Sequence, residues 1–205
     1  MARPMALRAM SGLGRALTPR AFWFLRHGET DWNAQGRSQG NVDVPMNAIG
    51  LAQARAAAAL LRHRGVVSVV ASPLGPARVT AEIVAEALGL TVAFDDGLRE
   101  AAFGVQEGQP MGQWFADWTE GAFTPEGGES FATLRARAIA AVNRALAGPA
   151  PVLVVSHGGL FRTLRAEMGL VSNQRTQNGV PIFCAPPSCA SGPPWTLTPA
   201  AALAG

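Results

Sequence analysis

Two of the three histidines in this chain follow apolar runs and are themselves followed by glycine. His27 stands in the segment RHGET (26–30), and His157 stands in SHGG (156–159). A histidine that attacks phosphorus must be neutral, and it needs a cationic cradle for the phosphoryl oxygens, which the fork of Arg26 suits. A protonated His157 would add a second positive donor. The glycines let backbone N–H groups approach an anion, so the pattern predicts phosphoryl-transfer chemistry rather than two unrelated structural histidines.

The elements around these histidines predict an α/β fold. Buried strands are expected over 21–26, 66–71 and 151–156, a short strand over 92–94, and a late hairpin from 180–184 and 195–197. Helices are expected over 47–64, 76–88, 111–118, 130–146 and 159–168. This alternation predicts three α/β/α layers around a mostly parallel, doubly wound sheet. Ligands bind at the carboxyl ends of such strands, where both histidines fall.

The overall charge is concentrated at the beginning of the chain. All 17 basic residues among the 205 are arginines, and the sequence pI is near 10.0. Four arginines and no acidic residue lie in residues 1–20, whereas 13 arginines face 14 acidic residues from Ala21 onward. The body of the protein is therefore not expected to bind nucleic acid. Its apolar runs are too short to cross a membrane, so no membrane partner is expected either.

The length predicts one domain, preceded by a leader. Residues 1–20 are expected to be a flexible arginine-rich extension; an organellar transit peptide is the alternative. Residues 21–205 form the domain. With two cysteines, Cys184 and Cys189, and no metal-ligand spacing among the histidines, we expect a reduced, cytoplasmic protein without metal or cofactor. The sequence does not predict an oligomeric state.

Six segments give the chain a family resemblance over about 22–197. They are RHGETDWN (26–33), GRSQGNVDVPMNAIGLAQA (36–54), SPL with TAEIV (72–84), LREAAFGVQEG (98–108), PEGGES (125–130) and VVSHGG (154–159). In this order and spacing they resemble the histidine phosphatase superfamily, also called the phosphoglycerate mutase-like family. GRSQGNVDVP resembles the phosphatase branch of that family. The resemblance implies the doubly wound fold, a phosphohistidine intermediate, and a cap segment inserted around 103–128.

The resemblance also implies a role for individual residues. His27 would take the phosphoryl group, and Glu100 would protonate the leaving oxygen and then activate water. Burial or the phosphate charge is expected to raise the pKa of Glu100. His157 completes the catalytic set. The expected phosphate-binding residues are Arg26, Asn33, Thr30, Gln39 and Gly158, with Asn178 in a loosely matching stretch.

Other residues in the matched segments have ordinary explanations. Glu107 is equally well explained as a turn residue, and Glu129 as a carboxylate at the start of a helix. Trp114, Phe115 and Trp118 have the spacing to cover the mouth of the site, although at helical spacing such residues more often pack in a core.

One position departs from the family pattern. The family usually has a phosphate-binding arginine at the second position after its S-x-L triplet, and Pro76 occupies that position here. Arg78 lies two residues later, which on a helix turns its side chain by roughly 200°, so it is not expected to substitute. A phosphatase acting on a small phosphorylated metabolite is the leading interpretation. A phosphoglycerate mutase, and a weakly active or inactive phosphate-binding relative, are the alternatives.

Overall fold

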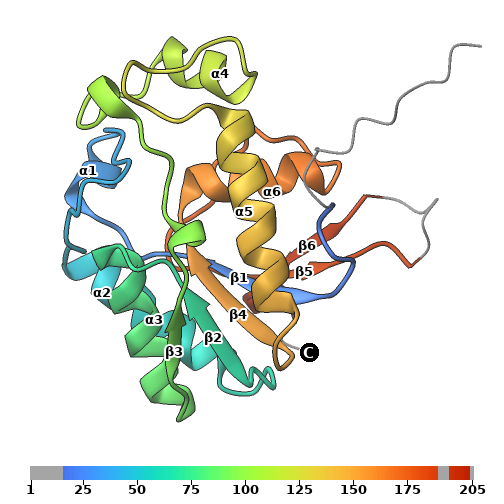
Figure 1. The fold of residues 1–205 in the computed structure, drawn as a ribbon. Coiled ribbons are helices and arrows are strands. Elements are labelled where there is room, and N and C mark those ends of the chain that lie inside the picture. The colour runs from blue at the N-terminus through green and yellow to red at the C-terminus, as the bar shows by residue number, and fades with distance from the viewer. Residues whose placement is uncertain (1–15, 189–193, 204–205) are drawn as a thin grey trace, which may run out of the picture.

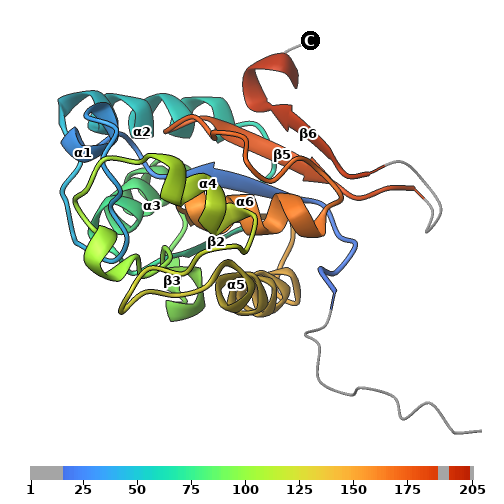
Figure 2. The ribbon, with the colours of Figure 1, turned by 90° about the horizontal axis from the view of Figure 1, so that it is seen from above.

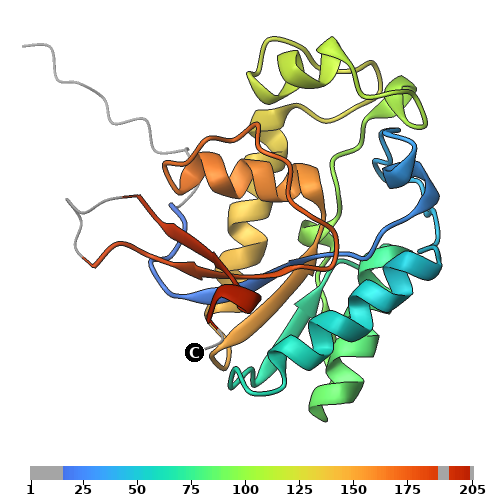
Figure 3. The ribbon, with the colours of Figure 1, turned by 180° about the vertical axis from the view of Figure 1, so that it is seen from behind.

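The computed structural model describes residues 16–188 and 194–203 and places a six-stranded sheet at the centre of the molecule (Figure 1). The strand order is β3-β2-β4-β1-β5-β6. The strands are β1 (Phe22–Arg26), β2 (Ser68–Ala71), β3 (Val92–Phe94), β4 (Val152–Ser156), β5 (Pro181–Ala185) and β6 (Thr196–Pro199). The first four pair in parallel, whereas β5 is antiparallel to β1 and β6 is antiparallel to β5. The predicted late hairpin thus completes one edge of the sheet (Figure 3).

Helices cover both faces of the sheet and give the predicted three layers (Figure 2). One face carries α2 (Ala48–Leu61) and α3 (Gly75–Leu88), and the other carries α5 (Phe131–Leu146) and α6 (Gly158–Glu167). The short helices are α1 (Asp31–Ala34), α4 (Gln113–Thr119) and the 3-10 turns η1 (Asp96–Leu98), η2 (Gly104–Gln106) and η3 (Ala200–Leu203). None of the helices in the described ranges is long and apolar enough to cross a membrane.

The alternation of side chains along the central strand explains the two cores. Phe22 and Phe24 of β1 pack among α5 and α6, whereas Trp23 and Leu25 pack among α2 and α3. Successive side chains of a strand point to opposite faces, so a strand that is buried on both faces must be apolar throughout. All four of these residues are buried, as the apolar run predicted.

Most predicted helix ends are confirmed within a few residues. The Asn47 side chain accepts a hydrogen bond from the Gly50 N–H and caps α2, and Ser130 caps α5 in the same way. Gly89 ends α3 in the left-handed conformation, at φ 68°. The sequence reading missed α1, a four-residue helix that follows Thr30.

The structured domain begins before Ala21, earlier than the predicted boundary. Leu17 is buried in the core beside α5, and the Thr18 N–H donates to Asn143 Oδ1 over 2.8 Å. Arg20 Nη1 donates to the carbonyl oxygens of Leu146 and Gly148 at the end of the same helix. Residues 16–20 therefore pack on the domain, and the rest of the predicted extension, residues 1–15, lies outside the described residues.

A small aromatic cluster forms the core of the segment between η2 and α5. Trp118 of α4 is fully buried and packs edge-to-face on Phe103 and Phe131, with centroids 5.0 and 5.1 Å away. Trp114 and Phe115 pack against the same cluster. This segment stands above the carboxyl ends of the parallel strands (Figure 1). His27 and His157 directly follow two of those strands, β1 and β4.

Candidate active site

The backbone around His27 is fixed from three sides. The His27 N–H donates to the Ser156 carbonyl over 3.0 Å, which continues the parallel pairing of β1 with β4. The Gly28 N–H donates to Thr80 Oγ1 of α3 over 3.0 Å. Asn178 Nδ2 donates to the His27 carbonyl over 2.9 Å. His27 therefore stands on rigid elements at the end of a central strand.

The imidazole of His27 is held neutral in a defined tautomer. Its Nδ1 lies 2.8 Å from the carbonyl oxygen of Gly28, which can only accept, so Nδ1 carries the proton and Nε2 keeps its lone pair. Burial first, and then the positive charge of Arg26, lower the pKa of His27 to about 3. At neutral pH the ring is therefore neutral, with the lone pair on Nε2 available.

His157 lies next to His27, with ring centroids 5.1 Å apart. Its Nε2 is 2.8 Å from the Ser72 hydroxyl oxygen. Burial, followed by electrostatic interaction with His27 and Arg26, lowers the pKa of His157 well below its usual range. A buried imidazole beside cations resists taking a proton, so His157 does not by itself supply the positive donor that a protonated ring would offer. A phosphate dianion would shift that balance toward protonation.

Glu100 is buried at the N-terminus of α6 and faces the same cavity. Its Oε2 accepts from the Gly159 N–H over 2.7 Å, and its Oε1 accepts from the Leu160 and Ala101 N–H groups over 2.8 and 3.0 Å. Burial raises the pKa of Glu100, as the sequence predicted, and the three N–H donors oppose part of that rise. A Cβ on Gly159 would lie 2.6 Å from Oε1, so glycine is needed for the carboxyl to reach this position.

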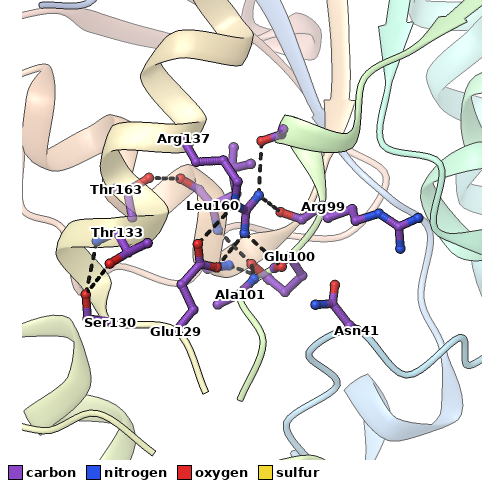
Figure 4. A network of polar contacts seen from close by, with 12 residues as sticks. Asn41, Arg99, Glu100, Ala101, Glu129, Ser130, Thr133, Arg137, Leu160 and Thr163 are labelled. Carbon is purple, nitrogen blue, oxygen red and sulfur yellow. Dashed lines mark hydrogen bonds and ion pairs between the residues drawn. The ribbon is translucent and has the colours of Figure 1, made fainter. Parts of the chain in front are cut away.

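The backbone of Glu100 is held by Arg137 of α5 (Figure 4). Arg137 donates to the carbonyl oxygens of Gly97, Arg99 and Glu100 over 3.0, 2.8 and 3.2 Å. Its Nε and Nη2 bind the two carboxylate oxygens of Glu129 over 3.0 and 2.5 Å. All five donors of the guanidinium are thus used. Glu129, whose role the sequence left open, supports this scaffold.

Arg26 is the cation beside His27. Its Nη1 donates to the Thr176 carbonyl over 2.7 Å, and its Nε is buried without an acceptor among the described residues. Burial lowers the pKa of Arg26 to about 10, so it remains charged at neutral pH. A Cβ on Gly158 would lie 3.2 Å from Nε, which is tighter than an ordinary contact, so a larger residue there would press on the Arg26 side chain.

The remaining predicted phosphate-binding residues divide into two groups. Asn33, Gln39 and Gly158 line the cavity, together with Arg26. Thr30 does not, which corrects its predicted role: it caps α1 and donates to Gln39 Oε1 over 2.8 Å. Asn178, which matched the family only loosely, also donates to Asn33 Oδ1 over 3.0 Å and so positions that amide.

Sequence reasoning missed several residues of the cavity wall. They are Arg37, Ser38, Phe103, Met111, Gly159, Arg162, Arg175 and Thr176. Arg162 lies one helical turn after Gly159, so the spacing on the predicted helix was a usable signal. Arg175 and Thr176 lie in the irregular segment between α6 and β5, whose course carries no local signal.

Two other candidates, Glu107 and Trp118, lie outside the cavity wall. Glu107 Oε1 accepts from the backbone N–H groups of Asn41 and Phe103 and so holds a turn. Trp118 belongs to the aromatic core, whereas Phe115 contributes to the cavity.

The structure also shows where Pro76 lies, the residue at the position where the family usually has a phosphate-binding arginine. Pro76 lies in the buried first turn of α3 and does not line the cavity. Arg78 is exposed and pairs with Glu82 at 3.6 Å, so it does not replace the missing guanidinium, as predicted.

Comparison with known proteins agrees with this geometry. The profile of the histidine phosphatase superfamily (branch 1) matches residues 22–179. The chain belongs to the histidine phosphatase superfamily. A probable phosphoglycerate mutase GpmB of Yersinia pestis (strain Pestoides F) is 42% identical over 148 residues, which cover 66% of this chain and 68% of the relative.

Solved structures of similar proteins show the same fold. A mycobacterial glucosyl-3-phosphoglycerate phosphatase in complex with VO3 superposes with a TM-score of 0.73 at 33% identity, covering 87% of this chain and 97% of the other. The protein TTHB049 of Thermus thermophilus superposes with a TM-score of 0.67 at 30% identity, covering 80% and 92%. The predicted fold class, a phosphoglycerate mutase-like α/β sheet between helices, is confirmed.

Proposed function

We propose that this histidine phosphatase hydrolyses a phosphomonoester of a small metabolite through a phosphohistidine on His27. The observation that carries the proposal is the placement of a neutral, single-tautomer imidazole, a buried carboxyl and a cation around one cavity. Acid–base and nucleophilic groups within reach of one ligand position are what a two-step transfer requires. No cofactor or metal takes part in the proposed steps.

In the first step, the lone pair on His27 Nε2 forms the N–P bond as the ester O–P bond breaks. Glu100 gives its proton to the departing oxygen, and the alcohol leaves. Glu100 Oε2, which accepts one hydrogen bond against two at Oε1, is the oxygen that carries this proton. In the second step, water attacks phosphorus and gives a proton to the Glu100 carboxylate. The N–P bond then breaks, and orthophosphate and neutral His27 are released.

The cationic side chains supply binding and charge stabilisation in both steps. Arg26 binds the phosphoryl oxygens beside His27, with Asn33, Gln39 and the start of α6 at Gly158 around them. Because Pro76 supplies no guanidinium, we expect slower turnover than in a relative with arginine there. One preorganised donor is worth on the order of 10²–10³-fold in rate.

Hydrolysis of sugar phosphates, phosphoglycerates, nucleotides and p-nitrophenyl phosphate tests the proposal. We expect the chain to release orthophosphate from at least one of them and the His27→Ala variant to release none. Full phosphate release by His27→Ala would overturn the proposal. Interconversion of 2- and 3-phosphoglycerate, primed by a bisphosphate, would replace it with a mutase. Tight orthophosphate binding without turnover would indicate a binding protein.

A further inference from the structure

The wall of the catalytic cavity carries more positive charge than one phosphoryl group needs. Arg26, Arg37, Arg162 and Arg175 line it, and Glu100 is its single acidic residue among the lining residues described. A phosphomonoester carries about two negative charges at neutral pH. The proposed steps use Arg26 and the polar groups beside His27. They assign no role to Arg37, Arg162 and Arg175.

The arginines of the cavity wall other than Arg26 differ in how many of their guanidinium donors already bind other groups of the protein. Arg37 donates through Nε to the Gly108 carbonyl, and its Cζ lies 4.5 Å from the centroid of the Trp32 ring, so it holds the fold. Arg162 donates through Nη1 to the Gln174 carbonyl, but its Nε is buried and has no acceptor among the described residues. Arg175 is exposed, and no hydrogen bond or ion pair joins it to the described part of the chain.

Arg162 and Arg175 both line the cavity that holds the catalytic groups. Arg162 follows Gly159, which binds Glu100, by three residues, so it lies on the same face of α6 about 4.5 Å further along the axis. Its Cζ lies 5.0 Å from the centroid of the Phe115 ring in α4. Arg175 immediately precedes Thr176, whose carbonyl binds Arg26. Both side chains thus line the cavity that also holds Arg26 and Glu100.

These cations also repel one another. Burial is the main cause that lowers the pKa of Arg26 and of Arg162, and the charge of Arg175 lowers both further. Placing like charges together costs stability unless an anion lies between them. Nothing in the described wall supplies that anion except Glu100, which must be protonated to act as the acid.

The geometry points to a second anion subsite formed by Arg162 and Arg175, so that the substrate is a small phosphorylated metabolite with a further carboxylate or phosphate group. This inference rests on the proposed phosphatase function and adds the substrate class. The second group binds about one helical turn from the transferred phosphoryl group. Carboxylate and phosphate share the geometry that a guanidinium fork recognises, so substrate pairs must separate them.

Two matched substrate pairs test the subsite. 3-Phosphoglycerate and glycerol 3-phosphate differ by a carboxylate, and fructose 1,6-bisphosphate and fructose 6-phosphate differ by a phosphate. For each pair, kcat/KM is measured for both members, and the ratio is taken of the member with the additional anionic group (here called the charged member) to the member without it. We expect the ratio to favour the charged member by at least about 10-fold in one pair, as one charge-assisted hydrogen bond provides. The pair with the larger ratio identifies the anionic group.

Arg162→Gln and Arg175→Gln should each lower that ratio by about 10-fold, chiefly through KM. Arg55→Gln, which removes the same charge from an exposed position on α2, is the matched control and should leave the ratio unchanged. Equal losses on both members of a pair would mean that the two arginines bind the transferred phosphoryl group in place of the arginine lost at Pro76. No loss on either member would mean that they do not touch substrate. Either result overturns the inference.

Calorimetry on His27→Ala separates failure of the subsite from failure of the proposed function, because it measures binding without turnover. The charged member should bind at least about 10-fold more tightly than its partner, and this preference should disappear in His27→Ala/Arg162→Gln. A preference without hydrolysis by the unsubstituted chain would support the subsite and reject the phosphatase. Hydrolysis by the unsubstituted chain without any preference between the two members would support the phosphatase and reject the subsite.

Discussion

The Nδ1 atom of His27 lies 2.8 Å from the carbonyl oxygen of Gly28, the residue that follows it. This contact directs the lone pair to Nε2 while burial and Arg26 keep the ring neutral. The same glycine lies against α2, where a Cβ would come within 2.3 Å of the Gly50 carbonyl oxygen. One short motif thus sets the tautomer of the nucleophile and fixes its strand end on the neighbouring helix.

The pH dependence of hydrolysis should follow Glu100 rather than His27. His27, with a pKa lowered to about 3, is neutral and competent at every pH well above that value. Glu100 must be protonated, and its pKa is raised, so kcat/KM should fall as the pH rises through that pKa. The measurement is the pH profile of kcat/KM between pH 3 and 9, corrected for the ionisation of the substrate phosphate. An acid limb near 6.5, the ordinary histidine value, would contradict the proposed state of His27.

Glu100→Gln should slow alkyl phosphate hydrolysis by about 10²–10⁴-fold, because the amide cannot deliver a proton. Its NH2 group also cannot accept the backbone N–H hydrogen bond that one of the two carboxyl oxygens accepts. The loss should be much smaller for p-nitrophenyl phosphate, whose weakly basic leaving group departs without a proton. Steady-state kinetics on both esters checks this difference. Equal losses on both would show that Glu100 does not act on the leaving oxygen.

Gly159→Ala should impair catalysis by displacing the Glu100 carboxyl, since the added Cβ would lie 2.6 Å from Oε1. Misplacement of this size costs on the order of 10²-fold in rate. Gly112→Ala is the matched control, because a Cβ there meets no atom within 4 Å. Kinetics and thermal unfolding of both variants are compared. Unchanged kcat in a folded Gly159→Ala protein would show that the position of Glu100 is not critical.

Pro76→Arg should raise kcat/KM by about 10-fold or more, by restoring a guanidinium at the position where the family usually has one. Pro76→Gln is the control, because it removes the proline from the first turn of α3 without adding charge. The expected gain is seen with arginine and is absent with glutamine. Rapid hydrolysis by the unsubstituted chain, with no gain in Pro76→Arg, would show that this arginine is dispensable here.

The sequence was sufficient to predict that the two histidines lie together, because the apolar runs and the rules of parallel-sheet topology both indicate it. Apolar runs before His27 and His157 indicated two parallel strands, and β1 and β4 are adjacent, with Arg26 opposite Ser156. Carboxyl ends of adjacent parallel strands meet, so the histidine pair followed from the pattern. The position of Glu100 came from the family resemblance rather than from spacing.

Tertiary structure decided what the sequence did not predict. Thr30 is in a site motif, but its hydroxyl caps α1, a helix too short to give a periodic signal. Arg175 reaches the cavity because the segment after α6 returns to β1, where Gly179 donates to the Arg26 carbonyl over 3.0 Å. The protonation of His157 depends on burial and on neighbouring cations, neither of which is encoded locally.

In the proposed reaction, His27 Nε2 carries the phosphoryl group between the two steps. Brief mixing with ³²P-labelled substrate, followed by alkaline denaturation and mass spectrometry, measures it directly. We expect acid-labile, alkali-stable phosphate on the peptide that contains His27, and none in His27→Ala. Label on another residue, or turnover at the normal rate without any labelled protein, would contradict the account.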